Sequence, residues 1–148
     1  MNKSISYHFE QRFLGILCLL LLFLVSTTSV HAQASDTTVL YKHDLKYVGS
    51  STTIDPNYRY VMEELIEILN TNPATTIHIR GHVCCGPSDR ISFTRARRVF
   101  KYFVKHGIDR QRISFKGYSD EVPLVFPEKT EEDEFMNRRV DFIINYHS

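Results

Sequence analysis

The sequence predicts a single α+β domain in which two helices pack on one face of a small mixed β-sheet. Two stretches of the chain carry apolar residues at the three- and four-residue spacing of a helix. Short stretches rich in β-branched and aromatic residues, typical of strands, stand before, between and after those helices. The resulting order of strand, helix, strand, helix, strand, strand predicts a βαβαββ two-layer sandwich.

A short strand is expected at 45–48, followed by a turn-rich loop over 49–53. Asp55 and Pro56 are typical of a helix start, because Asp accepts hydrogen bonds from free N–H groups and Pro fits the first turn. The apolar face of this first helix ends before Asn72-Pro73, which predicts its stop. That face consists of Tyr58, Met62, Leu65, Ile66 and Leu69.

The alternating residues 75–80 predict a strand that leads into the loop "GHVCCGPSD". A second helix is expected from about Asp89 to His106. Gly107 should end it, because glycine adopts the left-handed conformation at little cost. The residues expected to face inward from this helix are Phe93, Ala96, Val99, Phe100 and Phe103.

Two further strands complete the predicted sheet, one at 112–116 and one at 140–146. Between them lie a loop with two prolines, 117–127, and an acidic stretch, 128–136, that is expected to add a short helix. Because the apolar residues of all these elements fit one core, none of them requires a ligand to explain it.

The first 32 residues have the layout of a secretory signal peptide. Lys3 and Arg12 give a positive start, and Leu14–Val25 is an unbroken apolar run. That run is a dozen residues, whereas a membrane-spanning helix needs roughly 20. We therefore expect cleavage after Ala32, export across the inner membrane, and no transmembrane span in the mature chain.

Cleavage would leave a flexible segment, 33–44, and one domain, 45–148. The remaining 16 basic and 16 acidic side chains cancel, so no general attraction to nucleic acid is expected. The two signs are nevertheless segregated along the chain, which most often marks solvated faces. The basic residues gather at Arg90, Arg95, Arg97, Arg98 and Lys101, and the acidic ones at Glu128, Glu131, Glu132, Asp133 and Glu134.

Four segments, in this order and spacing, resemble the OmpA/MotB-like family of peptidoglycan-binding domains. They are "IHIRGHVCCG" (77–86), "SFTRARRVFKYFVKHGID" (92–109), "RISFKGYSDEVPL" (112–124) and "NRRVDFII" (137–144). The resemblance implies an OmpA-like sandwich in the cell envelope, periplasmic or outer-membrane-associated. It also implies a non-catalytic domain without a cofactor, which binds the diaminopimelate residue of the cell-wall peptide. An envelope protein is a further candidate partner.

In that family an aspartate and an arginine grip the charged groups of the ligand. The arginine of the motif falls on Arg95, whose guanidinium can offer two parallel N–H donors to a carboxylate. The aspartate falls on Cys84, and a neutral thiol is a poor partner for the ammonium of diaminopimelate. Losing that contact would cost about 1.5–3 kcal/mol. Binding is therefore expected to be weaker, to use another carboxylate, or to involve a different ligand.

Three further residues are candidates for ligand binding. Asp89 lies in the same loop, although it is also a natural N-cap for the second helix. Asn137 and Arg138 lie near the pocket by resemblance, but Asn137 suits a loop cap and Arg138 could pair with the acidic stretch before it.

The adjacent cysteines leave several interpretations open. Cys84 and Cys85 could form a vicinal disulfide, which export would favour, or stay reduced. With His82 they could bind zinc, although no fourth ligand is evident, and a nucleophilic Cys84 would lack an oriented base. We therefore expect neither a metal site nor a catalytic residue. The alternatives to peptidoglycan binding are a protein-interaction module and a thiol redox or metal-binding protein.

Overall fold

The computed structural model describes residues 35–147, so the signal peptide expected at 1–32 lies outside the described residues. Strands, helices and two 3-10 turns alternate along this part of the chain. They are β1 (Thr37–Leu40), β2 (Leu45–Lys46), η1 (Pro56–Tyr58), α2 (Arg59–Thr71), β3 (Thr76–Gly81), α3 (Asp89–Lys105), η2 (Arg110–Arg112), β4 (Ile113–Gly117), α4 (Glu131–Asn137) and β5 (Arg139–Tyr146). No helix of residues 35–147 is long and apolar enough to cross a membrane.

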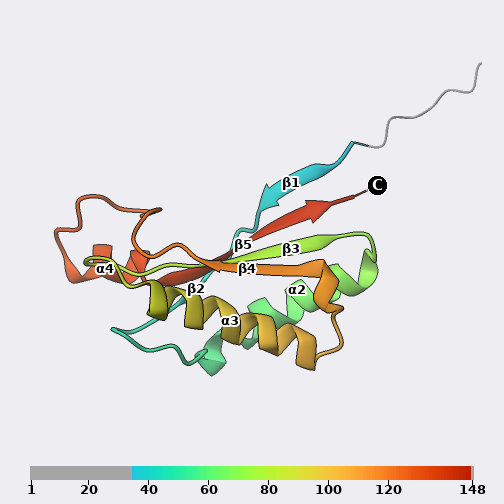
Figure 1. The fold of residues 1–148 in the computed structure, drawn as a ribbon, viewed down its shortest axis with the longest axis horizontal. Helices are drawn as coiled ribbons and strands as arrows, with labels where there is room; N and C mark the ends of the chain where they lie inside the picture. The colour runs from blue at the N-terminus through green and yellow to red at the C-terminus, as the bar shows by residue number, and fades with distance from the viewer. Residues whose placement is uncertain (1–34, 148) are drawn as a thin grey trace, which may run out of the picture. The chain divides into compact units, whose positions relative to one another are not determined.

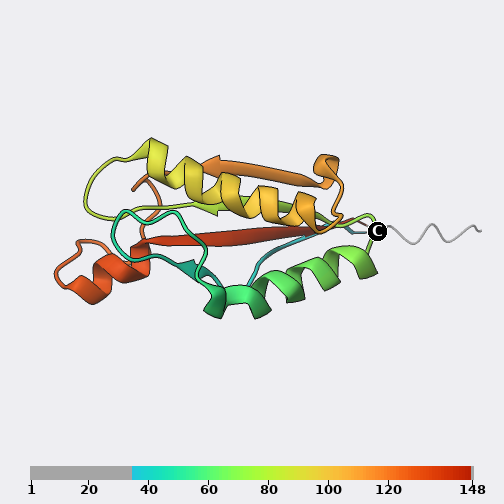
Figure 2. The ribbon, with the colours of Figure 1, turned by 90° about the horizontal axis from the view of Figure 1, so that it is seen from below.

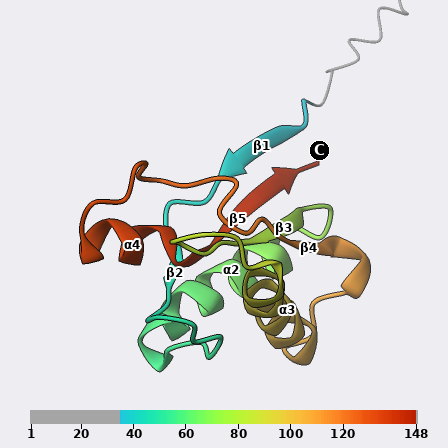
Figure 3. The same ribbon diagram turned by 60° about the vertical axis from the view of Figure 1, so that its left-hand side comes forward.

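The strands form one mixed sheet with the order β1-β5-β3-β4, and β2 pairs with the start of β5. The neighbours β3 and β4 run parallel, whereas β5 is antiparallel to β1, β2 and β3. Helices α2 and α3 lie side by side on one face of this sheet, and α4 lies at one end of it (Figures 1 and 2). A view roughly along α3 shows both helices on the same side of the sheet (Figure 3). The predicted α+β sandwich is therefore confirmed.

The core lies between the sheet and the two helices. Along β3 the residues alternate, so that Ile77 and Ile79 are buried against the helices. At the end of this strand α3 approaches closely, since a Cβ on Gly81 would overlap the carbonyl oxygen of Ser92. The helices contribute a shared set of fully buried side chains. These are Val61, Met62, Leu65 and Leu69 from α2, and Ala96, Val99 and Phe103 from α3.

Three sequence expectations need correction. The segment 33–44 was expected to be flexible, but Thr37–Leu40 is a strand whose backbone pairs with β5 although its side chains are all exposed. Phe93 is 46% exposed and packs against Phe115 at the edge of the core, because it lies beside the inward face of α3 rather than on it. The N-cap of α3 is Ser88 and not Asp89, which is already the first helical residue. Gly107 ends α3 with a positive φ of 90°, as predicted.

Candidate functional site

A cavity of about 440 Å³ opens at the end of the domain where the β3–α3 loop meets the β2–η1 loop and the end of α4. It brings together three of the predicted site residues, Cys84, Arg95 and Arg138, but neither Asp89 nor Asn137 lines it. The lining consists of Gly49, Ser50, Val83, Cys84, Cys85, Gly86, Pro87, Ser88, Ile91, Arg95 and Arg138.

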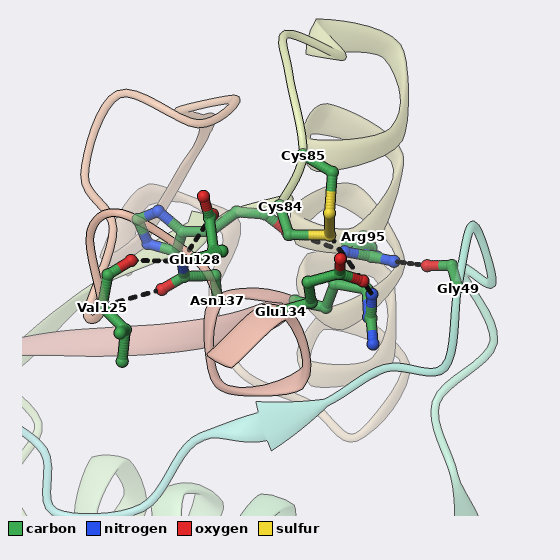
Figure 4. The surroundings of a disulfide bond; sticks show 10 residues. Gly49, Cys84, Cys85, Arg95, Val125, Glu128, Glu134 and Asn137 are labelled. Carbon is green, nitrogen blue, oxygen red and sulfur yellow. Dashed lines mark hydrogen bonds and ion pairs between the residues drawn. A yellow bond between two sulfur atoms is a disulfide. The ribbon is translucent and has the colours of Figure 1, made fainter. Parts of the chain in front are cut away.

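Arg95 reaches this cavity from inside the fold. Its side chain is fully buried, and all three guanidinium nitrogens donate hydrogen bonds to backbone carbonyls. Nη1 bonds the oxygen of His82 at 2.7 Å, Nη2 that of Gly49 at 2.7 Å, and Nε that of Ser51 at 2.9 Å. Figure 4 shows the contact between Arg95 and Gly49. Arg95 therefore ties the β2–η1 loop to the end of β3, and each terminal nitrogen keeps one N–H outside these bonds.

The charge of Arg95 has no carboxylate within ion-pair distance among the described residues. Burial lowers the pKa of the guanidinium to about 10, so it still carries its charge at neutral pH. The ring of Tyr47 lies 4.6 Å from it and adds a cation–π contact. A buried cation balanced only by carbonyl dipoles and one aromatic face favours an anion in the adjoining cavity.

The two cysteines are joined in a vicinal disulfide, with Cα atoms 3.8 Å apart. Cys84 is half-buried, whereas Cys85 is exposed and holds a positive φ of 63°. Nη1 of Arg138 lies 3.2 Å from Sγ of Cys84 and also donates to Glu134 at 3.0 Å. The carboxylate of Glu134 lies within 4.8 Å of both sulfurs, on the same side of the disulfide as Arg95 (Figure 4).

Of the two roles considered for Asn137, ligand contact and loop cap, its hydrogen bonds fit the loop cap. It is fully buried, and its amide accepts from the backbone N–H groups of Leu124 and Val125 while donating to Val125 O and to Glu128. These bonds fix the loop before α4, as Figure 4 shows for Val125 and Glu128. Asn137 therefore shapes the surroundings of the cavity rather than facing it.

A second polar cluster lies on the face of the sheet away from α2 and α3. Asp141 binds Arg80 through Oδ1 at 2.6 Å and Arg139 through Oδ2 at 3.1 Å. His82 is stacked on Tyr118, and its Nε2 lies 3.2 Å from the second carboxylate oxygen without the alignment of a hydrogen bond. Burial raises the pKa of Asp141, but the three basic neighbours outweigh that effect and lower it to about 2. His82 is therefore committed to this cluster and does not join the cysteines.

Sequence reasoning missed both Glu134 and this cluster. Glu134 looked like one more acid of a solvated run, and only the position of α4 brings it beside the two cysteines that line the cavity. A signal was present, because Glu134 and Arg138 have the i, i+4 spacing of a helical ion pair.

Comparison with known proteins agrees with this architecture. The model of the OmpA family matches residues 47–138. The chain belongs to the OmpA family. This confirms the resemblance inferred from the four sequence segments. Outer membrane porin F of Pseudomonas fluorescens is 31% identical over 102 residues, which cover 66% of this chain but only 31% of that protein.

Two solved structures have the same fold. The peptidoglycan-associated lipoprotein from Burkholderia pseudomallei aligns with a TM-score of 0.65 at 18% identity, over 70% of this chain and 90% of that one. The C-terminal domain of Helicobacter pylori MotB aligns with a TM-score of 0.63 at 21% identity, over 69% of this chain and 83% of that one. At these identities the likeness concerns the fold alone.

Proposed function

We propose that this domain is a non-catalytic module of the cell envelope that binds peptidoglycan through the cavity beside Arg95 and Arg138. Membership of the OmpA family supports the ligand class, and one solved relative is named for its association with peptidoglycan. The observation that carries the proposal is the fully buried guanidinium of Arg95, which has no carboxylate partner within the described chain and borders an open cavity.

In this proposal the diaminopimelate side arm of the stem peptide enters the cavity. Its carboxylate accepts hydrogen bonds from the N–H groups of Arg138, and the buried positive charge of Arg95 adds electrostatic attraction. Its ammonium meets Glu134, which lies close enough to Cys84 to supply the negative charge that the cysteine lacks. Glu134 thus replaces Asp89 as the candidate acid. Neither residue lines the cavity, but Glu134 lies within 4.8 Å of both cysteine sulfurs and pairs with Arg138, and these three residues do line it.

The disulfide supports a binding role rather than a catalytic one. While the two sulfurs are bonded to each other, neither is available as a nucleophile or as a zinc ligand. The family relationship likewise supports a location in the periplasm or at the outer membrane, reached with the signal peptide predicted at 1–32.

Sedimentation with purified peptidoglycan sacculi tests this proposal. Arg138→Gln and Glu134→Gln each remove one charged contact, so each should weaken binding by roughly tenfold to a hundredfold. Arg90→Ala, an exposed substitution on α3 outside the cavity, is the matched control and should bind like the wild type. Arg95→Ala is unsuitable because it would release three backbone carbonyls and disturb the fold. Equal binding by the wild type, Arg138→Gln and Glu134→Gln would refute the site.

A protein-interaction module is the second candidate, and one observation favours it. The loop between β4 and α4 exposes two large apolar side chains close together in sequence, Leu124 by 52% and Phe126 by 81%. If sacculi fail to retain the wild-type protein, while Phe126→Ser abolishes capture of an envelope protein by the purified chain, this alternative replaces the first.

A further inference from the structure

We propose that Cys84 and Cys85 form a thiol–disulfide exchange site for a dithiol partner, and that reduction there changes the charge of the binding cavity. The first part stands on the geometry of the two sulfurs and their neighbours. The second part, which concerns ligand binding, rests on the function proposed above.

The two sulfurs are not equivalent toward an attacking thiolate. Cys85 is exposed, so a partner can reach it from solvent. Cys84 is half-buried, and its sulfur lies 3.2 Å from Nη1 of Arg138. In thiol–disulfide exchange the better-stabilised thiolate leaves faster, and a neighbouring guanidinium stabilises a thiolate. This geometry assigns Cys85 as the sulfur attacked and Cys84 as the leaving sulfur.

The reaction balances with a dithiol as the reductant. A thiolate of the partner attacks Sγ of Cys85, the Cys84–Cys85 bond breaks, and its electron pair stays on Sγ of Cys84 beside Arg138. The second thiolate of the partner then attacks the partner sulfur of the mixed disulfide and releases Cys85, which takes up a proton. Two electrons have passed to this chain, and the partner has become a disulfide.

Reduction would alter the cavity in two ways. With the disulfide intact, Arg95 and Arg138 are the charged groups of the lining, and Glu134 pairs with Arg138 beside it, so the formal sum of the three charges is positive. A Cys84 thiolate would neutralise that excess and compete with Glu134 for Arg138, leaving the carboxylate free for an ammonium. Reduction should therefore disfavour a simple anion and favour a zwitterion such as diaminopimelate. Reduction also opens the small ring that the disulfide closes between Cys84 and Cys85. This frees Cys85 from its left-handed backbone conformation, which is rare for a residue with a side chain.

The exchange step is tested on the purified, oxidised protein. It is treated with glutathione or dithiothreitol, quenched with acid, alkylated and analysed by peptide mass spectrometry. We expect glutathione to be found on Cys85, and Arg138→Met to slow reduction by dithiothreitol about three- to tenfold. Arg138→Lys, which keeps a positive charge, should restore most of the rate. Glutathione mainly on Cys84, or equal rates for the wild type and Arg138→Met, would overturn the assignment.

The coupling to binding is tested by titrating diaminopimelate and acetate into the oxidised and reduced forms. We expect reduction to raise the ratio of the diaminopimelate affinity to the acetate affinity about tenfold. The double variant Cys84→Ser/Cys85→Ser should show no response to dithiothreitol. An unchanged ratio in a protein that binds sacculi overturns the coupling alone. Absence of sacculus binding in both forms, with exchange intact, overturns the proposed function and leaves the exchange site standing.

Discussion

Replacing Arg95 with methionine should lower the free energy of unfolding by about 2–4 kcal/mol. The carbonyl of buried His82 loses a charged donor, which costs about 1–3 kcal/mol when no new partner is found. The carbonyls of Gly49 and Ser51 belong to exposed residues and can turn to water, so each adds only about 0.5–1.5 kcal/mol. The variant no longer buries a charged guanidinium, and the desolvation cost that it avoids offsets part of this loss of stability.

Urea unfolding followed by circular dichroism measures this effect. Arg90→Met makes the same chemical change at an exposed position of α3 and should stay within about 0.5 kcal/mol of the wild type. For a domain of this size the loss at Arg95 corresponds to a fall in Tm of about 10–20 °C. Hydrogen exchange should also speed up over residues 48–54. If Arg95→Met and Arg90→Met unfold at the same urea concentration, the guanidinium does not hold the loop.

Three other predictions concern polar groups away from the cavity. Burial lowers the pKa of His82 below its usual 6.5, so on acidification the unfolded chain binds this proton at a higher pH than the folded chain does. Stability should therefore fall below about pH 6.5, and the urea midpoint of His82→Asn should fall less over this range than that of the wild type. Asp141 has a pKa of about 2 instead of 3.8, so it contributes about 2 kcal/mol to the free energy of unfolding, which is lost between about pH 4 and 2. Asp141→Asn should be less stable at neutral pH, but its free energy of unfolding should not show this decrease between about pH 4 and 2. Asn137→Ala removes four hydrogen bonds to the preceding loop and should lower stability by about 2–3 kcal/mol, with proteolysis at 122–128 accelerated; wild-type cleavage rates there would contradict its role.

Much of the fold could be predicted from local signals. The helix start at Asp55-Pro56 is a 3-10 turn in which Asp55 accepts from Asn57 N, so the capping signal was correct even though the α-helix begins at Arg59. The alternation of Ile77 and Ile79 and the stop at Gly107 were also correct. These features depend on residues close together in sequence, and their patterns are therefore visible without a structure.

The strand β1 could not be predicted in this way. Its four side chains are exposed, so its sequence carries no apolar alternation. What stabilises it is backbone pairing with β5, residues more than one hundred positions later, as in the pair Thr37 and Tyr146. Pairing of backbone groups leaves little trace in composition.

The role of Arg95 shows why a motif match was informative but incomplete. The match identified a residue at the cavity, yet a side chain on α3 can point to a ligand or into the fold at the same sequence position. The loop of residues 48–54 decides between these, because its carbonyls of Gly49 and Ser51 lie within reach of the guanidinium. Between Val48 and Ile54 that loop consists of glycine, serine and threonine alone, so its sequence does not predict the contact.

The surroundings of Cys84 are best understood when α4 is considered together with the β3–α3 loop. Thr130 and Asp133 form a capping box, so the carboxylate of Asp133 is used by the backbone N–H groups that open the helix. The next residue, Glu134, is then free to pair with Arg138 one turn later, at the edge of the cavity. A negative charge beside Cys84 is therefore supplied by the helix rather than by the loop. Under the proposed function, Glu134 therefore meets the ligand's ammonium, and position 84 can hold a sulfur whose bonding partner, and hence charge, can change.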